Sequence, residues 1–257
     1  MILKILLKEL QVNKMNVNKI GLLKIFGVML VFILAVWAVA AVPTGPSNIN
    51  VGASSRYSVA SASSASAIAG NVTELIFQAN SVTQTWQGYY GNISGSIKLG
   101  DSNNNTLYDW TAASPNGEIY ATRASGTPTW ASIACATTAQ TDTEDLALNV
   151  NSVVDQDAVG RTFLNTTSFN AFYVGNVNIN TSQDCKAVQL YNGSVAPSSD
   201  FQEVLLHDGS SLIYTAVIKQ NANGFDNNTH DFEMIVGEDG HNGDSTATPY
   251  YFYVELG

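Results

Sequence analysis

The chain has 257 residues, a formal net charge of −10, and charged side chains at only 12% of its positions. The charge is unevenly spread: the first 42 residues hold five Lys and one Glu, whereas six basic and twenty acidic residues follow Val42, a net charge of −14. A segment this acidic repels phosphates and anionic lipid head groups. DNA, RNA and peripheral membrane binding are therefore excluded for the part beyond Val42.

An uncharged apolar run extends from Ile25 to Val42, behind a basic N-terminal stretch. Its 18 residues reach the lower limit for a helix that spans a bilayer, and basic residues on the near side keep that end in the cytoplasm. The run ends in Ala38-Val39-Ala40, which fits the signal peptidase pattern with cleavage before Ala41. Two interpretations stay open: residues 1–42 are a cleaved signal peptide or a retained membrane anchor.

Both interpretations place the remaining chain outside the cell, secreted or held at the surface by residues 25–42, with the membrane contacted only through this segment. A start at Met15 instead of Met1 would give a basic stretch of more ordinary length. A type IV pilin signal is a third, less favoured interpretation, because Lys24 interrupts the apolar face and Lys19-Ile20-Gly21 is a poor processing site.

Residues 43–70 form a Ser/Ala-rich segment with a single charge, at Arg56. A segment of this composition buries too little apolar surface to offset its ordering entropy, which predicts a flexible spacer. From Asn71 onward the pattern changes to short runs of β-forming residues between turn residues. The sequence therefore predicts one domain over residues 71–257.

This domain is predicted to be all-β, an antiparallel β-sandwich or jelly-roll-like fold. Turn signals lie at 114–117, 208–210 and 221–226. Residues 141–150 are interpreted as a short helix capped by Thr141 or Thr143, or else as part of a long surface loop. The expected strands are 72–79, 81–91, 92–100, 106–112, 118–124, 128–136, 168–180, 186–192, 201–207, 211–220, 230–237 and 249–256.

The chain has two cysteines, Cys135 and Cys185. In an exported chain such a pair is expected to form a disulfide. The alternative is two buried free thiols, and a metal site is disfavoured because neither Cys has another Cys or a His at ligand spacing.

Seven Asn residues begin N-glycosylation sequons, and use of some of them is expected if the host glycosylates exported proteins. They are Asn71, Asn92, Asn104, Asn165, Asn180, Asn192 and Asn227.

A partial calcium-loop pattern begins at Asp101, with Asn103, Asn105 and Asp109 at positions 3, 5 and 9. It lacks Gly at position 6, and Ala112 stands where a bidentate acid is needed. A polar hairpin turn is the favoured interpretation, with Ca²⁺ as the only cofactor considered. The acidic, Gly-rich loop 237–244 is a second candidate cation site, with a solvated loop as the alternative interpretation.

No nucleophile or metalloprotease motif is present, and His207, His230 and His241 lie on separate segments. Asp231 and Glu233 share one strand face, which alone is thin evidence for acid–base chemistry. A non-catalytic protein is therefore favoured over a hydrolase. An aromatic cluster favours core packing over sugar stacking; it consists of Trp86, Tyr89, Tyr90, Trp110, Tyr120 and Trp130.

Three segments, 69–101, 230–240 and 249–257, resemble uncharacterised secreted proteins of archaea. The resemblance implies an archaeal cell-surface protein and brings no activity with it. The sequence thus predicts an exported structural or adhesive protein, an envelope component or contact module whose partners are other surface proteins or glycans. The alternative is a calcium-assisted carbohydrate-binding module, and a secreted hydrolase comes third.

Overall fold

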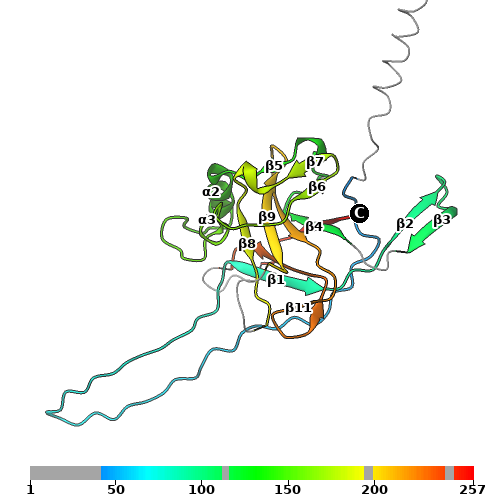
Figure 1. Cartoon of the computed structure of the whole chain (residues 1–257). Coiled ribbons are helices and arrows are strands. Elements are labelled where there is room, and N and C mark those ends of the chain that lie inside the picture. Colours follow the sequence, from blue (N-terminus) through cyan, green and yellow to red (C-terminus); the bar gives the residue numbers. More distant parts are fainter. Residues whose placement is uncertain (1–41, 112–115, 194–198, 241–245) are drawn as a thin grey trace, which may run out of the picture. The chain divides into compact units, whose positions relative to one another are not determined.

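The computed structural model describes residues 42–111, 116–193, 199–240 and 246–257. Within these ranges the protein is mostly β, with antiparallel sheets and few helices (Figure 1), which confirms the predicted antiparallel β class. The apolar run that was predicted to be a signal peptide or anchor lies, apart from Val42, outside the described residues. In the described ranges, no helix is both long enough and apolar enough to cross a membrane.

The central element is a six-stranded antiparallel sheet in the order β14-β4-β10-β9-β5, with β8 also paired to β9. The β9–β10 hairpin turns at Asp208–Ser210, as the sequence predicts. The bounds are β4 Gly117–Thr122, β5 Ala134–Cys135, β8 Ala187–Gln189, β9 Gln202–His207, β10 Leu212–Val217 and β14 Tyr251–Leu256.

Both faces of this sheet are buried, because its central strands carry apolar residues at odd and even positions alike. Successive residues point to opposite faces of a strand. On β9, Leu205 therefore packs in one core while Val204 and Leu206 pack in the other. On β10, Tyr214 and Ile213 divide in the same way.

Different elements cover the two faces. The first face lies under α2 (Thr138–Ala147), α3 (Val159–Thr162) and a ribbon of β1 (Trp86–Gly91) with β13 (Phe232–Gly237). The second face lies under η1 (Trp130–Ser132) and the hairpin of β6 (Phe172–Val174) with β7 (Val177–Ile179).

The remaining strands pair outside these layers. A hairpin of β2 (Ser96–Gly100) and β3 (Thr106–Thr111) is a two-stranded sheet of its own, and so is β11 (Ala222–Asn223) with β12 (Thr229–His230). The predicted turn at 114–117 does not join a hairpin, since β3 and β4 belong to different sheets; its residues 114 and 115 lie outside the described residues. A short helix, η2 (Thr181–Gln183), precedes Cys185.

The helix predicted over 141–150 is present, but it begins earlier than expected, as α2. Its N-cap is Thr137, which forms a capping box with Gln140, so the prediction of Thr141 or Thr143 as N-cap was wrong. Thr141 is buried inside the helix, and its hydroxyl donates to the carbonyl oxygen of Thr138 at 2.9 Å.

The strand predicted over 72–79 is absent. Residues 72–79 are extended and exposed, like the Ser/Ala-rich residues before them, and the first strand begins only at Trp86. A strand needs a neighbour to satisfy its backbone groups, and this segment has no strand partner among the described residues. The expected strand 128–136 is likewise replaced by η1, which covers three of its nine residues, and by the two residues of β5.

The predicted disulfide between Cys135 and Cys185 is confirmed, and it lies at the edge of the central sheet. Cys135 belongs to β5 and pairs with Leu206, while Cys185 precedes β8, where Ala187 pairs with Val204. Two short strands thus cover the outer edge of β9 one after the other, and the disulfide joins them at their junction.

Removing the bridge with Cys135→Ala and Cys185→Ala should lower the free energy of unfolding by about 4 kcal/mol, the chain-entropy value for a loop of this length. The bridged residues are 50 positions apart. Urea unfolding of the variant and of the reduced wild type would measure the loss. Equal stability of oxidised and reduced wild type would contradict a role for the bridge.

Candidate functional site

The β2–β3 hairpin carries an apolar face without a covering element. Cross-strand pairs Ile97–Trp110 and Leu99–Tyr108 place these four side chains on one side of the ribbon. Their exposed fractions lie between 47% and 57%, and none of the four belongs to the two hydrophobic cores of the described chain or packs against them. We call these four residues the hairpin face.

The opposite side of the hairpin carries a charged pair. Lys98 lies opposite Asp109, and the Nζ to Oδ2 distance is 3.7 Å. Leu107, the unpaired residue at the bulge of β3, is 79% exposed. Four apolar side chains gathered on one side are the pattern of a ribbon that covers a core. An isolated two-stranded hairpin is marginally stable in water, so an uncovered apolar side marks a surface that gains by acquiring a partner.

The turn of the hairpin contains the partial calcium pattern. The Asp101 carboxylate accepts the backbone N–H of Asn103 at 2.9 Å and of Asn105 at 2.8 Å, and the Asn105 side-chain amide at 2.8 Å. These hydrogen bonds lower the pKa of Asp101. Asp109 lies on β3 beside Lys98. Calcium binding stays a prediction; across the described ranges no group of three or more His, Cys, Asp or Glu is placed to hold a metal ion.

The hairpin is fixed to the domain at its root by a buried carboxylate. Asp231 is 4% exposed and accepts the backbone N–H of Ile93 and of Asn221, both at 2.8 Å. Gly95, two residues after Ile93, packs closely against the end of β14. A Cβ atom at this position would lie 2.5 Å from the side chain of Leu256. The root therefore touches two segments that are more than a hundred residues away in sequence.

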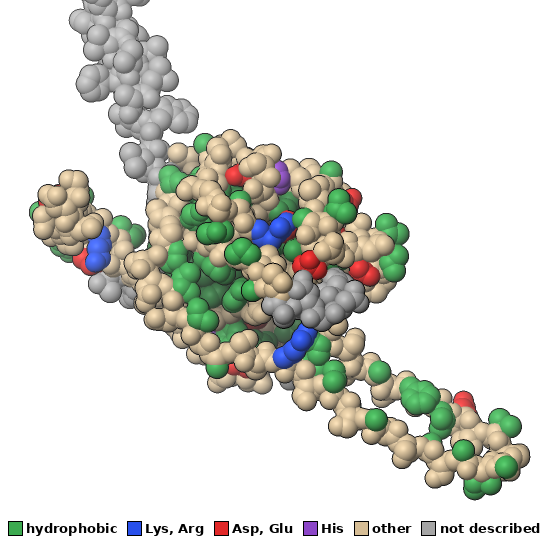
Figure 2. Space-filling view, turned by 180° about the vertical axis from the view of Figure 1, so that it is seen from behind, with side chains coloured by type: hydrophobic (Ala, Val, Ile, Leu, Met, Phe, Trp, Pro, Cys, Tyr) green, Lys and Arg blue, Asp and Glu red, His purple; other side chains and the backbone are tan. Residues whose placement is uncertain are grey.

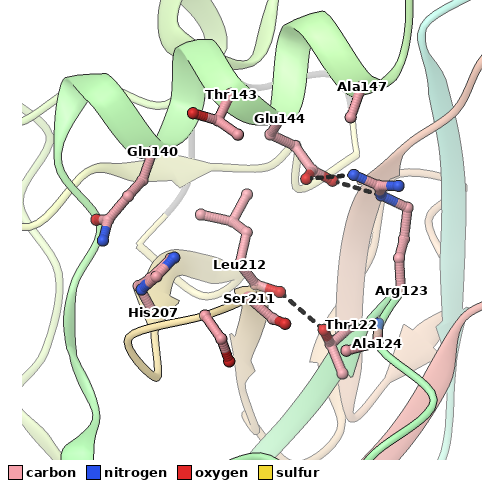
Figure 3. A pocket seen from close by; sticks show the side chains of 11 residues that line it. Thr122, Arg123, Ala124, Gln140, Thr143, Glu144, Ala147, His207, Ser211 and Leu212 are labelled. Carbon is pink, nitrogen blue, oxygen red and sulfur yellow. Dashed lines mark hydrogen bonds and ion pairs between the residues drawn. The ribbon is translucent and has the colours of Figure 1, made fainter.

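A pocket of about 320 Å³ lies between α2 and the β9–β10 hairpin (Figure 3). On the wall of the pocket, Arg123, which directly follows β4, donates two hydrogen bonds to the Glu144 carboxylate of α2, from Nε at 2.9 Å and from Nη2 at 2.6 Å (Figure 3). This bidentate pair raises the pKa of Arg123. Its charge is thus compensated within the protein.

The hydroxyl and imidazole groups at this pocket are engaged locally. Ser210 donates its hydroxyl to Asp208 at 2.9 Å, and the Nδ1 atom of His207 accepts the backbone N–H of Gly209 at 2.8 Å. A nucleophile and its base must lie within hydrogen-bond reach of each other, and these two groups are each directed elsewhere. A secreted hydrolase stays an untested prediction.

Two carboxyl groups meet around Tyr120 on the sheet face covered by the β6–β7 hairpin. Glu118 and Glu255 are cross-strand partners, and the Tyr120 hydroxyl lies 3.5 Å from the first carboxylate and 3.1 Å from the second. Glu255 also accepts the backbone N–H of Gly175 at 3.1 Å. Burial, and then the charge of Glu255, raises the pKa of Glu118 to about 8.

Five of the seven predicted sequon residues have exposed side chains: Asn71, Asn92, Asn104, Asn165 and Asn227. The other two are engaged in hydrogen bonds. Asn180 accepts from the backbone N–H of Ser182, and Asn192 donates to Asp200 at 2.7 Å. Glycosylation stays a prediction, and the geometry favours the five positions whose side chains are exposed.

The aromatic residues of the predicted cluster divide between core and surface. Tyr120 and Trp130 are buried, and Trp86 packs against Phe163 and Tyr214. Trp110, in contrast, stands half-exposed on the hairpin face. Its partners there went unrecognised in the sequence, although the i, i+2 spacings of Ile97 with Leu99 and of Tyr108 with Trp110, on either side of a polar turn, were a usable signal.

The other predicted polar residues are separate from this site. His230 is buried and lies 2.9 Å from Asp226, and Glu233 accepts the backbone N–H of Phe225 at 2.8 Å. In loop 237–244, Glu238 accepts the hydroxyl of Thr248 and Asp239 accepts the side-chain amide of Asn149. His241 and Asp244 lie outside the described residues.

Comparison with protein-family models, with curated proteins and with solved structures found no match for this chain.

Glu118→Gln should flatten the pH dependence of stability. Glu118 keeps its proton up to about pH 8 in the folded state and loses it near its usual value when unfolded, so its contribution is full below that value and falls as pH rises toward 8. Denaturant unfolding between pH 5 and 8 would measure this slope. Asp142→Asn, an exposed carboxylate, is the control; an unchanged slope in Glu118→Gln would contradict the assignment.

Asp231→Ala should loosen the root of the hairpin, because it leaves two backbone N–H groups without their acceptor. The expected loss is roughly 1–3 kcal/mol for each amide. Hydrogen exchange at Ile93 and Asn221 should accelerate, while Asp142→Ala, with the same charge change at an exposed position, should leave both amides protected. Equal exchange in the two variants would show that the carboxylate does not hold the root.

Proposed function

We propose that this protein is an exported, cell-surface structural or adhesive component that makes contact through the hairpin face. The observation that carries the proposal is a group of four half-exposed apolar residues on one side of a two-stranded hairpin. Export is supported by the apolar run at 25–42 and by the disulfide, since such bridges persist in oxidising compartments. The domain is non-catalytic in this proposal.

Contact with another surface protein is favoured over stacking on a sugar ring. The rings of Tyr108 and Trp110 lie edge to face, with centroids 4.7 Å apart and planes at 61°. A sugar ring stacks on a flat aromatic surface, whereas this arrangement with Ile97 and Leu99 beside it gives a contoured apolar patch. Such patches are typical of protein–protein contacts.

The finer parts of the proposal rest on weaker support. A sandwich is supported by the packing of β13 residues Met234 and Val236 over the same core as β10, which gives two stacked β layers. The likeness of three segments to secreted proteins of archaea supports an archaeal surface. A glycan partner, with or without calcium, is the second candidate and is supported by the exposed aromatics alone.

Trp110→Asp should abolish contact while leaving the domain folded, because the side chain is half-exposed and touches no buried core. The measurement is retention of the labelled full chain on the surface of host cells, with the melting temperature as a check on folding. Tyr173→Asp is the matched control: Tyr173 is an aromatic on β6 that is 60% exposed and lies outside the hairpin.

Retention of Tyr173→Asp but not of Trp110→Asp would support the proposal. Equal retention of both variants would overturn it. Release of the wild type by free sugars or by a calcium chelator would favour the carbohydrate-binding alternative instead.

A further inference from the structure

The extended segment before the domain carries large apolar side chains in full contact with water. Val72, Ile76 and Phe77 are each more than 80% exposed, and Leu75 is 54% exposed. We call residues 72–79, VTELIFQA, the free segment. Figure 2 shows hydrophobic side chains standing out along the extended chain. Its composition is that of a strand, yet the described part of the chain provides it with no partner.

Both ends of the surrounding loop are fastened to the domain. At one end Thr44 exchanges two backbone hydrogen bonds with Val254, at 3.0 and 2.8 Å. At the other end Thr83 donates its hydroxyl to the Asp157 carboxylate, and the indole N–H of Trp86 donates to the Asp157 carbonyl oxygen at 2.6 Å. The free segment is thus displayed in a loop with fixed ends, which makes it available to a partner without requiring the domain to unfold.

The two outer edges of the central sheet are covered, wholly or in part, by other segments. The outer edge of β9 is covered by β5 and β8, and the outer edge of β14 is occupied at Val254 by Thr44. Thr44 lies between Pro43 and Pro46, which have no N–H to extend a ladder. On β1, the Gln87 side chain donates to the carbonyl oxygen of Gly88 at 2.7 Å. Natural proteins block edges by such means.

The β2–β3 hairpin differs in its exposed apolar side; like β1–β13, β6–β7 and β11–β12, it is a two-stranded sheet whose outer edges pair with no further strand within the described ranges. It has five residues in β2 and six in β3, a length that the eight residues of the free segment are enough to span. A third strand would also bring the hairpin to the number of strands at which a sheet with an apolar face becomes stable.

The side-chain patterns of the two elements are complementary. If the free segment lies antiparallel beside β2 with Leu75 opposite Ile97, then Leu75 and Phe77 extend the apolar hairpin face beside Thr73, while Val72 and Ile76 fall on the other side. Glu74 also falls on that other side, opposite Lys98. Lys98 is one of only three Lys beyond Val42, and its side chain is 58% exposed. Opposite charges at directly opposed positions stabilise a strand pair.

We propose that the free segment of one copy adds as a third strand to the β2–β3 hairpin of a second copy, so that copies join head to tail. The occupant is a second copy because this chain supplies both halves of the contact. The contact also matches the one charge of the free segment with a cation, although two copies whose parts beyond Val42 each carry a net charge of −14 otherwise repel each other. A heterologous contact of this kind closes into a ring or continues as an open filament, depending on the rotation between successive copies.

A copy's own free segment is less well placed for its own hairpin. Thr83 and Trp86 are held at the start of β1. The chain that leads to the β2–β3 hairpin leaves β1 at its other end, where Gly91 pairs with Phe232. The segment would have to run back along the whole of β1 to reach β2. This inference rests on the proposed function, since it names the partner of the hairpin face.

The test uses cysteine pairs in full chains that carry two different tags, expressed together in the native host. One chain carries Leu75→Cys and the other Ile97→Cys, and mild oxidation is followed by non-reducing electrophoresis. The native cysteines are both in the disulfide, so they offer no competing thiol. The matched controls are Val59→Cys with Ile97→Cys, and Leu75→Cys with Tyr173→Cys, all at exposed positions.

We expect a disulfide-linked heterodimer of the two tags for the Leu75–Ile97 pair, in yields several-fold above both control pairs. Adding Glu74→Lys to the first chain should lower that yield, because a second cation would face Lys98. A chain that carries both Leu75→Cys and Ile97→Cys should form a ladder of linked multimers.

Three results would overturn the inference. Yields equal to those of the controls would show that the two elements do not meet. A doubly substituted chain that closes an internal bridge as a monomer would show that the segment serves its own copy. Cross-linking of Ile97→Cys to a different surface protein would overturn self-assembly but leave the proposed function standing. If Trp110→Asp is in addition retained on cells as well as the wild type is, both the inference and the proposed function are overturned.

Discussion

Buried carboxylates that accept backbone N–H groups hold the connections of this domain to its sheets. Asp231 does so at the root of the β2–β3 hairpin, and Asp145 does so at α3, where it accepts the N–H of Val159 at 2.7 Å. Glu203, fully buried on β9, accepts the N–H of Ile235 on β13 at 2.9 Å. Each bond replaces the water that an unpaired amide would otherwise need, so a loop or strand can be buried without a neighbouring ladder.

This use of acids changes the interpretation of the composition. A net charge of −14 beyond Val42 suggests an acidic surface, but several of these acids point inward. Burial raises the pKa of Glu203 well above its usual range, whereas backbone hydrogen bonds from Thr129, Ser210 and Ser211 lower the pKa of Asp208 to about 2. The formal charge therefore overstates the repulsion that two folded copies exert on each other.

The sequence was enough to predict the strands that have a clear local pattern. It failed where the formation of a strand depends on whether a neighbouring strand is available for pairing. Alternating or continuous apolar runs were enough to find β9, β10 and β13, and the Asp208–Ser210 turn between them. The disulfide was predictable because two cysteines leave one pairing, and the expected export favours its formation. Residues 72–79 have the same β-forming composition as β13, yet only β13 has a neighbour to pair with. Composition shows the propensity of a segment to form a strand, but not whether a second strand is available to pair with it.

The candidate site depends on this distinction between local pattern and long-range pairing. Ile97, Leu99, Tyr108 and Trp110 have the spacing of residues that cover a core, and the usual expectation is that a third strand or a helix lies over them. In this protein their ribbon is fastened at Asp231 and Gly95 and then continues without a cover, while the free segment stands without a sheet. The outer edges of the central sheet are occupied by Thr44 on β14 and by β5 and β8 on β9. Within the described ranges the hairpin therefore combines an unpaired edge with an exposed apolar side, which is the combination that the proposed strand addition requires.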